Sequence, residues 1–416
     1  MGLACALELL KSGHSVILYE ADDRVGGMTA HFDFNGLSIE RYYHFICMPD
    51  QPMFDVLAEL NISDKLHWRT TKMGYYYNGK LYDWGNPIAL LKFKPLSFID
   101  RLRYGLHMFY CTKIKDGSNL DSQEASNWIK NWIGQRAYNV LWKKLFELKF
   151  HKFTNNLSAS WIWARIRRVG TSRKNLFTEQ MGYLEGGSET LLKAFEKAII
   201  EKKGAFHLST KVKKIIISDG KVKGLMTGDN DVDKFDHVIS TIPLPFVPDM
   251  IDDLPEHISN AYKKIDNIGV VCVIIQLKKQ VTENFWLNIN DERLDVPGII
   301  EYSNLRDLDV NVVYVPFYLP RDNKKFQRVD QDFIDEARAI IKTVNPSIQD
   351  DDIIDIHASR YGYAQPICPP EFKATLPPLN GIIEGLIIAD TSYYYPEDRS
   401  ISESVDLGKS LATLVQ

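Results

Sequence analysis

Residues 20–29 read EADDRVGGMT, and this stretch decides the fold. The adjacent glycines Gly26 and Gly27 let backbone amides come close to a phosphate group, and Arg24 can supply a fixed positive charge beside it. The alternative is a glycine turn with no ligand beside an arginine on the protein surface, which would show the same residues. The interpretation therefore depends on whether the neighbouring segments also fit a phosphate-binding fold.

The segment before this stretch has the pattern of half a dinucleotide-binding unit. Residues 3–12 place leucines at helical spacing, and residues 16–20 form a short apolar strand that ends in Glu20. Glu20 lies 18 residues after Gly2, close to the separation of about 20 residues between a G-x-G-x-x-G turn and its ribose-binding acid. The first strand and first two glycines are missing, so we expect Met1 to be an internal methionine with that strand encoded upstream. The alternative is an unrelated helix followed by a strand.

Residues 20–29 resemble the E-x-x-x-R-x-G-G-x-x-[ST] segment of FAD enzymes of the amine oxidase and protoporphyrinogen oxidase superfamily, with Met28 as a mild departure. The resemblance recurs in order along the chain: in residues 182–188 with Val212, in residues 237–243, in residues 385–390, and in the helix that follows. It implies FAD as the cofactor. The residues that it places on FAD are Gly2, Glu20, Arg24, Gly26, Gly27, Met28, Thr29, Val212, Thr241, Asp390 and Ile401.

The resemblance also implies the domain organisation. We expect an α/β protein with a Rossmann-like FAD-binding domain of the glutathione reductase 2 type, formed by residues 1–45, 180–245 and 355–416. Residues 46–179 and 246–354 are expected to form an inserted α+β substrate domain. Two hairpin turns, at Asn78-Gly79 and Asp219-Gly220, support strand pairs in both parts.

The implied activity is oxidation of a C–N or C–C bond by hydride transfer to flavin N5. The absence of a second glycine fingerprint for NAD(P)H favours reoxidation by oxygen, a quinone or another acceptor. Two alternatives remain open. One is a flavoenzyme similar to UDP-galactopyranose mutase that acts on a nucleotide sugar, and the other is a non-catalytic binding protein on the same scaffold.

Candidate catalytic residues lie after the glycine stretch, in the run Tyr42-Tyr43-His44-Phe45. In the superfamily this segment passes close to the flavin ring, so His44 and Tyr43 are the catalytic candidates. The alternative for His44 is a core histidine with its hydrogen bonds satisfied, and Tyr43 can simply pack. Cys368 is a weak candidate for covalent flavin attachment, because no cysteine motif surrounds it.

Composition limits the remaining possibilities. The 416-residue chain has a formal net charge of −4, which gives no reason to expect nucleic-acid binding, and we expect a small-molecule substrate. Its five cysteines are scattered without a CxxC pair, which favours a cytoplasmic protein without a metal site.

Residues 88–115 combine apolar and basic side chains and could contact a membrane surface. Alternatively, they cap the substrate domain. Pro95 interrupts any single long helix there. The oligomeric state is left open.

Overall fold

The computed structural model describes residues 1–228 and 232–415. Short parallel strands build one half of the molecule. Strand β1 (Ile17–Tyr19) pairs in parallel with β9 (Ala205–His207), and β13 (Val238–Ser240) pairs in parallel with β19 (Leu386–Ile388). Helices α1 (Gly2–Lys11), α8 (Ser188–Glu201) and α12 (Ile401–Ala412) pack together beside these strands. The helix and strand expected within residues 3–20 are therefore confirmed as α1 and β1.

The two parallel pairs do not hydrogen-bond to each other within the described residues. Residues of β1 and β13 instead line one common cavity. The additional strand that we expect before α1 stays a prediction.

A large mixed sheet forms the other half. Its strands are ordered β18 (Ile353–Pro366), β14 (Asn267–Leu277), β17 (Asn311–Pro320), β16 (Gly298–Glu301), β15 (Trp286–Asn290), β5 (Met73–Tyr77) and β6 (Lys80–Trp84). Alternate residues of β14 and β17 face opposite sides, as pleated strands require. One side packs against α10 (Asp330–Val344), and the other joins the largest hydrophobic core.

Glycine turns close both expected hairpins. Asn78 and Gly79 have φ values of 46° and 77° between β5 and β6. Asp219 and Gly220 have φ values of 54° and 71° between β10 (Lys214–Ser218) and β11 (Lys221–Met226), and β12 (Val232–Lys234) completes that sheet. Both turns need two residues with positive φ, which Asn, Asp and Gly tolerate best. The hairpins predicted at these positions are confirmed.

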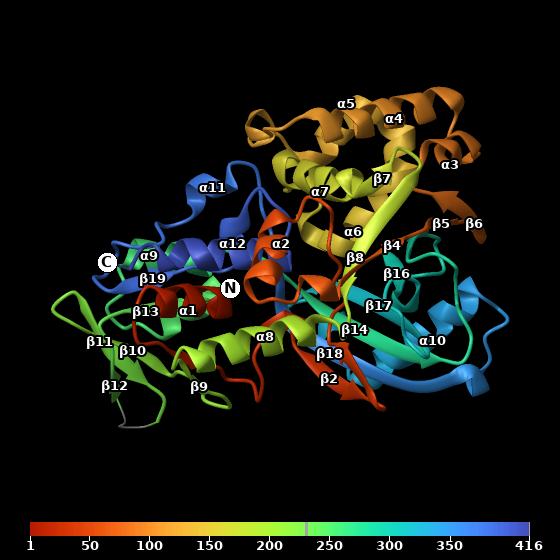
Figure 1. Ribbon diagram of the computed structural model, residues 1–416. Coiled ribbons are helices and arrows are strands. Elements are labelled where there is room, and N and C mark those ends of the chain that lie inside the picture. Colours follow the sequence, from red (N-terminus) through yellow and green to blue (C-terminus); the bar gives the residue numbers. More distant parts are fainter. Residues whose placement is uncertain (229–231, 416) are drawn as a thin grey trace.

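Helices gather at one end of the molecule, well apart from α1 and α8 (Figure 1). This layer contains α3 (Pro87–Lys92), α4 (Phe98–Lys113), α5 (Ala125–Tyr138), α6 (Lys144–Phe150) and α7 (Ala159–Thr171). Residues 93–97 separate α3 from α4, so the helix break expected from Pro95 is confirmed. Ser97 and Asp100 form a reciprocal capping box at the start of α4, which satisfies its first backbone amides.

The remaining elements join the two halves. One three-stranded sheet crosses the expected domain boundary at residue 180, which falls inside its central strand. Its order is β4 (Leu66–Thr70), β8 (Thr178–Leu184) and β7 (Arg173–Asn175). Hairpin β2 (His31–Phe34)–β3 (Leu37–Glu40) contacts the large sheet through Phe32 and His357. The other helices are α2 (Gln51–Glu59), α9 (Glu256–Lys263) and α11 (Phe372–Thr375). Among the described residues, none of the helices has the length and apolar character needed to cross a bilayer.

Candidate functional site

A cavity of about 1620 Å³ connects the two halves. At one end it is lined by the start of α1 and by the glycine stretch, and at the other by residues of α3, α4, α6 and α7. A cavity of this size exceeds the several hundred Å³ that hold a typical small ligand. It therefore has room for a large cofactor and a substrate together.

The glycine stretch forms the first wall of the cavity. Gly26 and Gly27 have φ values of 113° and 56°, and Gly27 begins a short 3₁₀ helix that ends at Thr29. The Thr29 hydroxyl donates to the Gly26 carbonyl at 2.5 Å, which holds this turn closed. A methyl group built on Gly27 would meet no heavy atom within 4 Å. The turn therefore leaves space for a phosphate group to come close to its backbone amides.

Glu20 and Arg24 differ in where they point. Glu20 follows β1, lines the cavity, and accepts a 2.9 Å hydrogen bond from the Asp22 amide through one carboxylate oxygen. Arg24 does not line the cavity. Its guanidinium donates to the Asp23 carboxylate at 2.6 and 2.9 Å and to the His31 carbonyl at 2.8 Å. Glu20 thus lines the cavity, whereas Arg24 turns toward β2 and away from it.

The remaining predicted cofactor residues come from distant segments and meet at the same cavity, which Gly2, Met28, Val212, Thr241, Asp390 and Ile401 all line. A methyl group on Gly2 would lie 3.3 Å from the Thr241 hydroxyl, so α1 packs closely against the end of β13. The buried Asp390 carboxylate accepts from the Leu244 and Ser392 amides at 2.9 and 2.7 Å, and burial raises its pKa.

Helix α12 contributes its N-terminus. Ser400 caps this helix by accepting from the Glu403 amide at 3.0 Å, and both Ser400 and Ile401 line the cavity. The start of α1 also lines it. The N-terminus of a helix stabilises a nearby negative charge. The two helix N-termini at this cavity would therefore stabilise the pyrophosphate of a dinucleotide or the anionic form of a reduced flavin. The residues present therefore fit FAD.

The two predicted catalytic residues, Tyr43 and His44, also line the cavity. His44 Nδ1 lies 2.7 Å from the Tyr42 carbonyl, and burial lowers the His44 pKa to about 4, which keeps the ring neutral near pH 7. The Tyr43 hydroxyl lies 2.9 Å from the Tyr318 hydroxyl, and burial raises the Tyr43 pKa well above its usual value. The Tyr43 ring packs edge-on against Trp286 with centroids 5.5 Å apart. Both predicted residues therefore reach the cavity wall.

Several charged residues at this end were missed. Lys149, Arg165, Arg168, Asp398 and Arg399 all line the cavity. They come from α6, α7 and the loop before α12, so no spacing in the sequence connects them.

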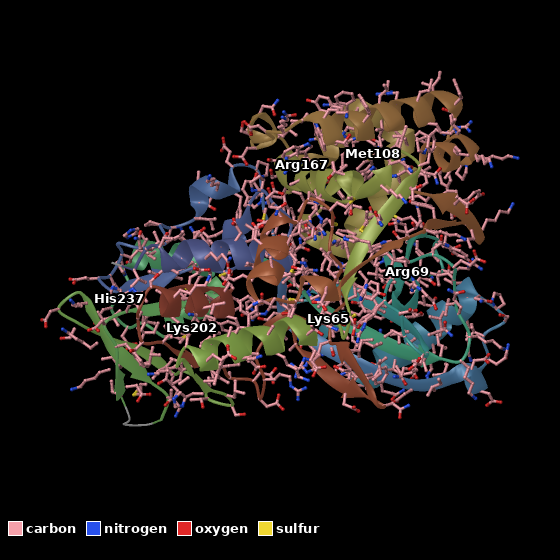
Figure 2. All side chains as sticks on the ribbon, in the orientation of Figure 1. Lys65, Arg69, Met108, Arg167, Lys202 and His237 are labelled. Atoms are coloured by element: carbon pink, nitrogen blue, oxygen red, sulfur yellow. The ribbon has the colours of Figure 1, made fainter. Side chains whose placement is uncertain are left out.

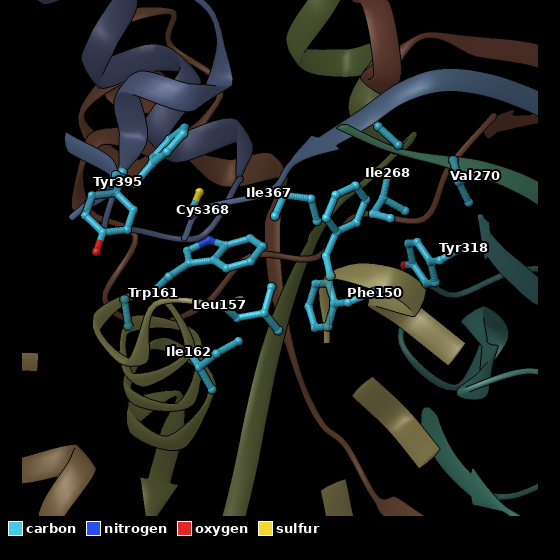
Figure 3. Close-up of a cluster of buried hydrophobic side chains, with 14 of the residues drawn as sticks. Phe150, Leu157, Trp161, Ile162, Ile268, Val270, Tyr318, Ile367, Cys368 and Tyr395 are labelled. Atoms are coloured by element: carbon cyan, nitrogen blue, oxygen red, sulfur yellow. The ribbon is translucent and has the colours of Figure 1, made fainter. Parts of the chain in front are cut away.

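Cys368 does not line the cavity. It is buried in an apolar cluster near Trp161 and Tyr395, and burial raises its pKa well above the usual value (Figure 3). A thiolate for covalent attachment is disfavoured in such surroundings.

The model of flavin-containing amine oxidoreductases matches residues 2–359. The chain belongs to this family. The membership confirms the resemblance found in the sequence, the α/β fold class and FAD as the cofactor, and FAD-dependent oxidoreductase is the enzyme class of this family.

Three proteins are similar to this chain in sequence or in fold. The chain is 22% identical over 302 residues to a 15-cis-phytoene desaturase of Synechococcus elongatus, covering 66% of this chain and 62% of that protein. A putrescine oxidase structure with bound putrescine has a TM-score of 0.74 at 13% identity, with 99% of this chain and 96% of that chain covered. A reduced UDP-galactopyranose mutase has a TM-score of 0.73 at 15% identity, with 99% and 91% covered. These structural likenesses concern the fold alone.

Proposed function

We propose that this protein oxidises a C–N or C–C bond in a largely apolar small molecule, with FAD as the hydride acceptor. The observation that carries the proposal is the single cavity that joins the predicted FAD residues to a chamber under α4. Bound FAD supplies a two-electron acceptor at its N5 atom. The chain itself supplies binding, orientation and exclusion of water.

The chamber is suited to an apolar substrate. Its wall under the helical layer includes Leu90, Met108, Leu145, Ile166 and Val169. Met108 lies on α4 in the helical layer (Figure 2). Side chains of this type bury apolar surface at about 25 cal/mol per Å², which is enough to hold a hydrocarbon without many polar contacts. The neutral His44 and the paired hydroxyls of Tyr43 and Tyr318 are among the polar groups that could orient a reacting bond.

Purified protein tests this proposal directly. We expect the purified protein to show the visible absorbance band of oxidised FAD. This band should disappear when the protein is mixed anaerobically with an oxidisable amine or unsaturated hydrocarbon. A colourless protein that takes up no added FAD would instead support the non-catalytic alternative. Conversion of UDP-galactopyranose only after dithionite reduction would support the mutase alternative.

We also propose that the helical layer contacts a membrane surface. Nine large apolar side chains are exposed on α3, α4 and the β7–β8 turn: Ile88, Leu91, Phe98, Ile99, Leu102, Leu106, Phe109, Leu176 and Phe177. Exposed basic residues lie on the same segments, including Lys92, Lys94, Arg103 and Lys113. Apolar and basic side chains together match the acyl region and phosphate groups of an anionic bilayer.

This apolar surface is continuous with the cavity. Phe109 and Leu176 are 58% and 62% exposed, and both also line the cavity. An apolar molecule leaving a bilayer at this point would therefore enter the chamber without crossing water, which supports a membrane-derived substrate.

Vesicle flotation tests the membrane contact. We expect FAD-loaded protein to float with vesicles that contain phosphatidylglycerol, and the double variant Ile99→Ser, Leu106→Ser to stay behind. Ile200→Ser is the matched control, because Ile200 is 61% exposed on α8, away from this surface. If wild-type protein remains in the soluble fraction with and without anionic lipid, the helices α3 and α4 only cap the substrate domain.

A further inference from the structure

Lys149 is a buried lysine without a hydrogen-bonding partner. It lies in the last turn of α6, is 9% exposed, and lines the cavity. Within the part of the chain that the structure describes, its ammonium group makes neither a hydrogen bond nor an ion pair. Its contacts are aromatic: the Nζ atom lies 5.1 Å from the Tyr318 ring centroid and 5.8 Å from that of Phe150. Charges buried without a partner are costly, so such a lysine needs an explanation.

The charges around Lys149 are not balanced. Asp398 lines the cavity together with Lys149, Arg165, Arg168 and Arg399. Of these cations, Arg168 is already satisfied, because it donates two hydrogen bonds, at 2.9 and 2.6 Å, to Asp50. Arg399 donates to the Ala364 carbonyl. These four basic side chains therefore meet two carboxylates, Asp398 and Asp50.

The other ion pair of this group, between Arg165 and Asp398, is incomplete. Arg165 Nη1 lies 3.4 Å from Asp398 Oδ1, and each of these two buried atoms lacks a hydrogen-bond partner. The Asp398 pKa is lowered: burial opposes this, but the charges of Arg165, Lys149, Arg168 and Arg399 together exceed it. An ionised Asp398 is thus shared among several cations, and Lys149 and Arg165 keep hydrogen-bonding capacity for another acceptor.

We infer that Lys149, with Arg165 beside it, binds an anionic group of the substrate, a carboxylate or a phosphate. The inference rests on the proposed function, because it assumes that the apolar chamber holds the rest of that substrate. An anion in this position would provide the partner that Lys149 lacks, while its apolar portion extends toward Met108 and Phe109. The substrate is then an amphiphile with an apolar chain and an acidic group.

Burial and the neighbouring Arg165 lower the Lys149 pKa well below its usual value. A bound anion acts in the opposite direction, because an opposite charge favours the protonated amine. Lys149 is therefore a group whose charged state an acidic ligand would stabilise. The same carboxylate or phosphate on a water-exposed lysine would gain much less, since exposed ion pairs are screened.

Three ten-carbon probes below their micelle concentration test this inference: decanoate, decyl phosphate and decanol. Isothermal titration of FAD-loaded protein should show decanoate or decyl phosphate binding about 10–100-fold more tightly than decanol, the range expected for a charge-assisted hydrogen bond. In Lys149→Met this preference should disappear while decanol binding stays unchanged. Removal of a buried, unpartnered charge should not impair folding, and Lys149→Gln provides a second variant.

Lys152→Met is the matched control. Lys152 follows three residues later, just beyond the end of α6. Its side chain is 54% exposed and pairs with Asp322 at 2.6 Å outside the cavity. Its substitution should leave the preference for the anionic probes intact. Tighter binding of only one anionic probe identifies a carboxylate or a phosphate as the ligand group.

The inference is overturned if wild-type protein binds all three probes equally, or if Lys149→Met keeps the preference. Flavin content, read from absorbance, reports separately on the proposed function. A flavin-loaded protein without anion preference contradicts only the role of Lys149.

Discussion

Replacing Gly27 by alanine tests whether the glycine stretch binds the cofactor or only shapes a turn. Gly27 has a φ of 56°, so alanine costs about 1 kcal/mol of folding free energy in this left-handed conformation. The added methyl group meets nothing within 4 Å in the protein itself. If the Gly27 amide faces the FAD pyrophosphate, the methyl group should displace about one charge-assisted hydrogen bond, worth about 1.5–3 kcal/mol. We therefore expect FAD affinity to fall about 10–100-fold.

Two neighbouring substitutions provide the comparison. Gly36→Ala carries the same type of backbone cost, because Gly36 has a φ of 81° and open space around it, but it lies at the β2–β3 turn and does not line the cavity. Gly26→Ala should destabilise the protein by about 2–5 kcal/mol even without FAD. Its φ is 113°, and the new methyl group would lie 2.7 Å from Leu192 Cδ1 and 3.2 Å from the Ala30 amide nitrogen.

The assay combines urea unfolding of the apoprotein with titration of FAD fluorescence. The expected pattern is a modest stability loss in Gly27→Ala and Gly36→Ala, with weakened FAD binding only in Gly27→Ala. Equal FAD affinity in these two variants would refute the argument that the Gly27 backbone contacts the cofactor.

Three further predictions concern single side chains. Glu20→Ala should weaken FAD binding by about 1.5–3 kcal/mol through loss of a ribose contact, and unchanged affinity in an FAD titration would contradict it. His44→Ala should retain FAD but slow its anaerobic reduction by substrate in stopped-flow measurements; unchanged kinetics would leave His44 a packing role. Burial raises the Glu301 pKa to about 8, above its usual value of 4.5, so the folded chain holds a proton that the unfolded chain releases. Stability should therefore fall by up to about 4 kcal/mol between pH 4.5 and 8, and Glu301→Gln should flatten this dependence in urea unfolding.

The candidate cofactor residues could be chosen from the sequence because they occupy local patterns. The glycine turn, the acid after β1 and the cap of α12 each sit within a few residues of a helix or strand end. Local geometry constrains such positions strongly, since only glycine adopts the φ of Gly26 at little cost. Arg24 shows the limit of this reasoning. The pattern gave its residue type, but the direction of its side chain depends on Asp23 and the His31 carbonyl.

The proposed substrate chamber could not be predicted in this way, because contacts between distant segments build it. Asp50, before α2, accepts both hydrogen bonds of Arg168 on α7, and the loop before α12 adds Asp398 and Arg399. No periodicity in the sequence connects residues that are 118 positions apart, as Asp50 and Arg168 are. Removing either partner of this buried pair would leave an uncompensated charge, at a cost of about 3–5 kcal/mol. The charges that position α2 and α7 therefore also set the electrostatics of this part of the cavity, so a substitution there changes both its charge and the stability of the region.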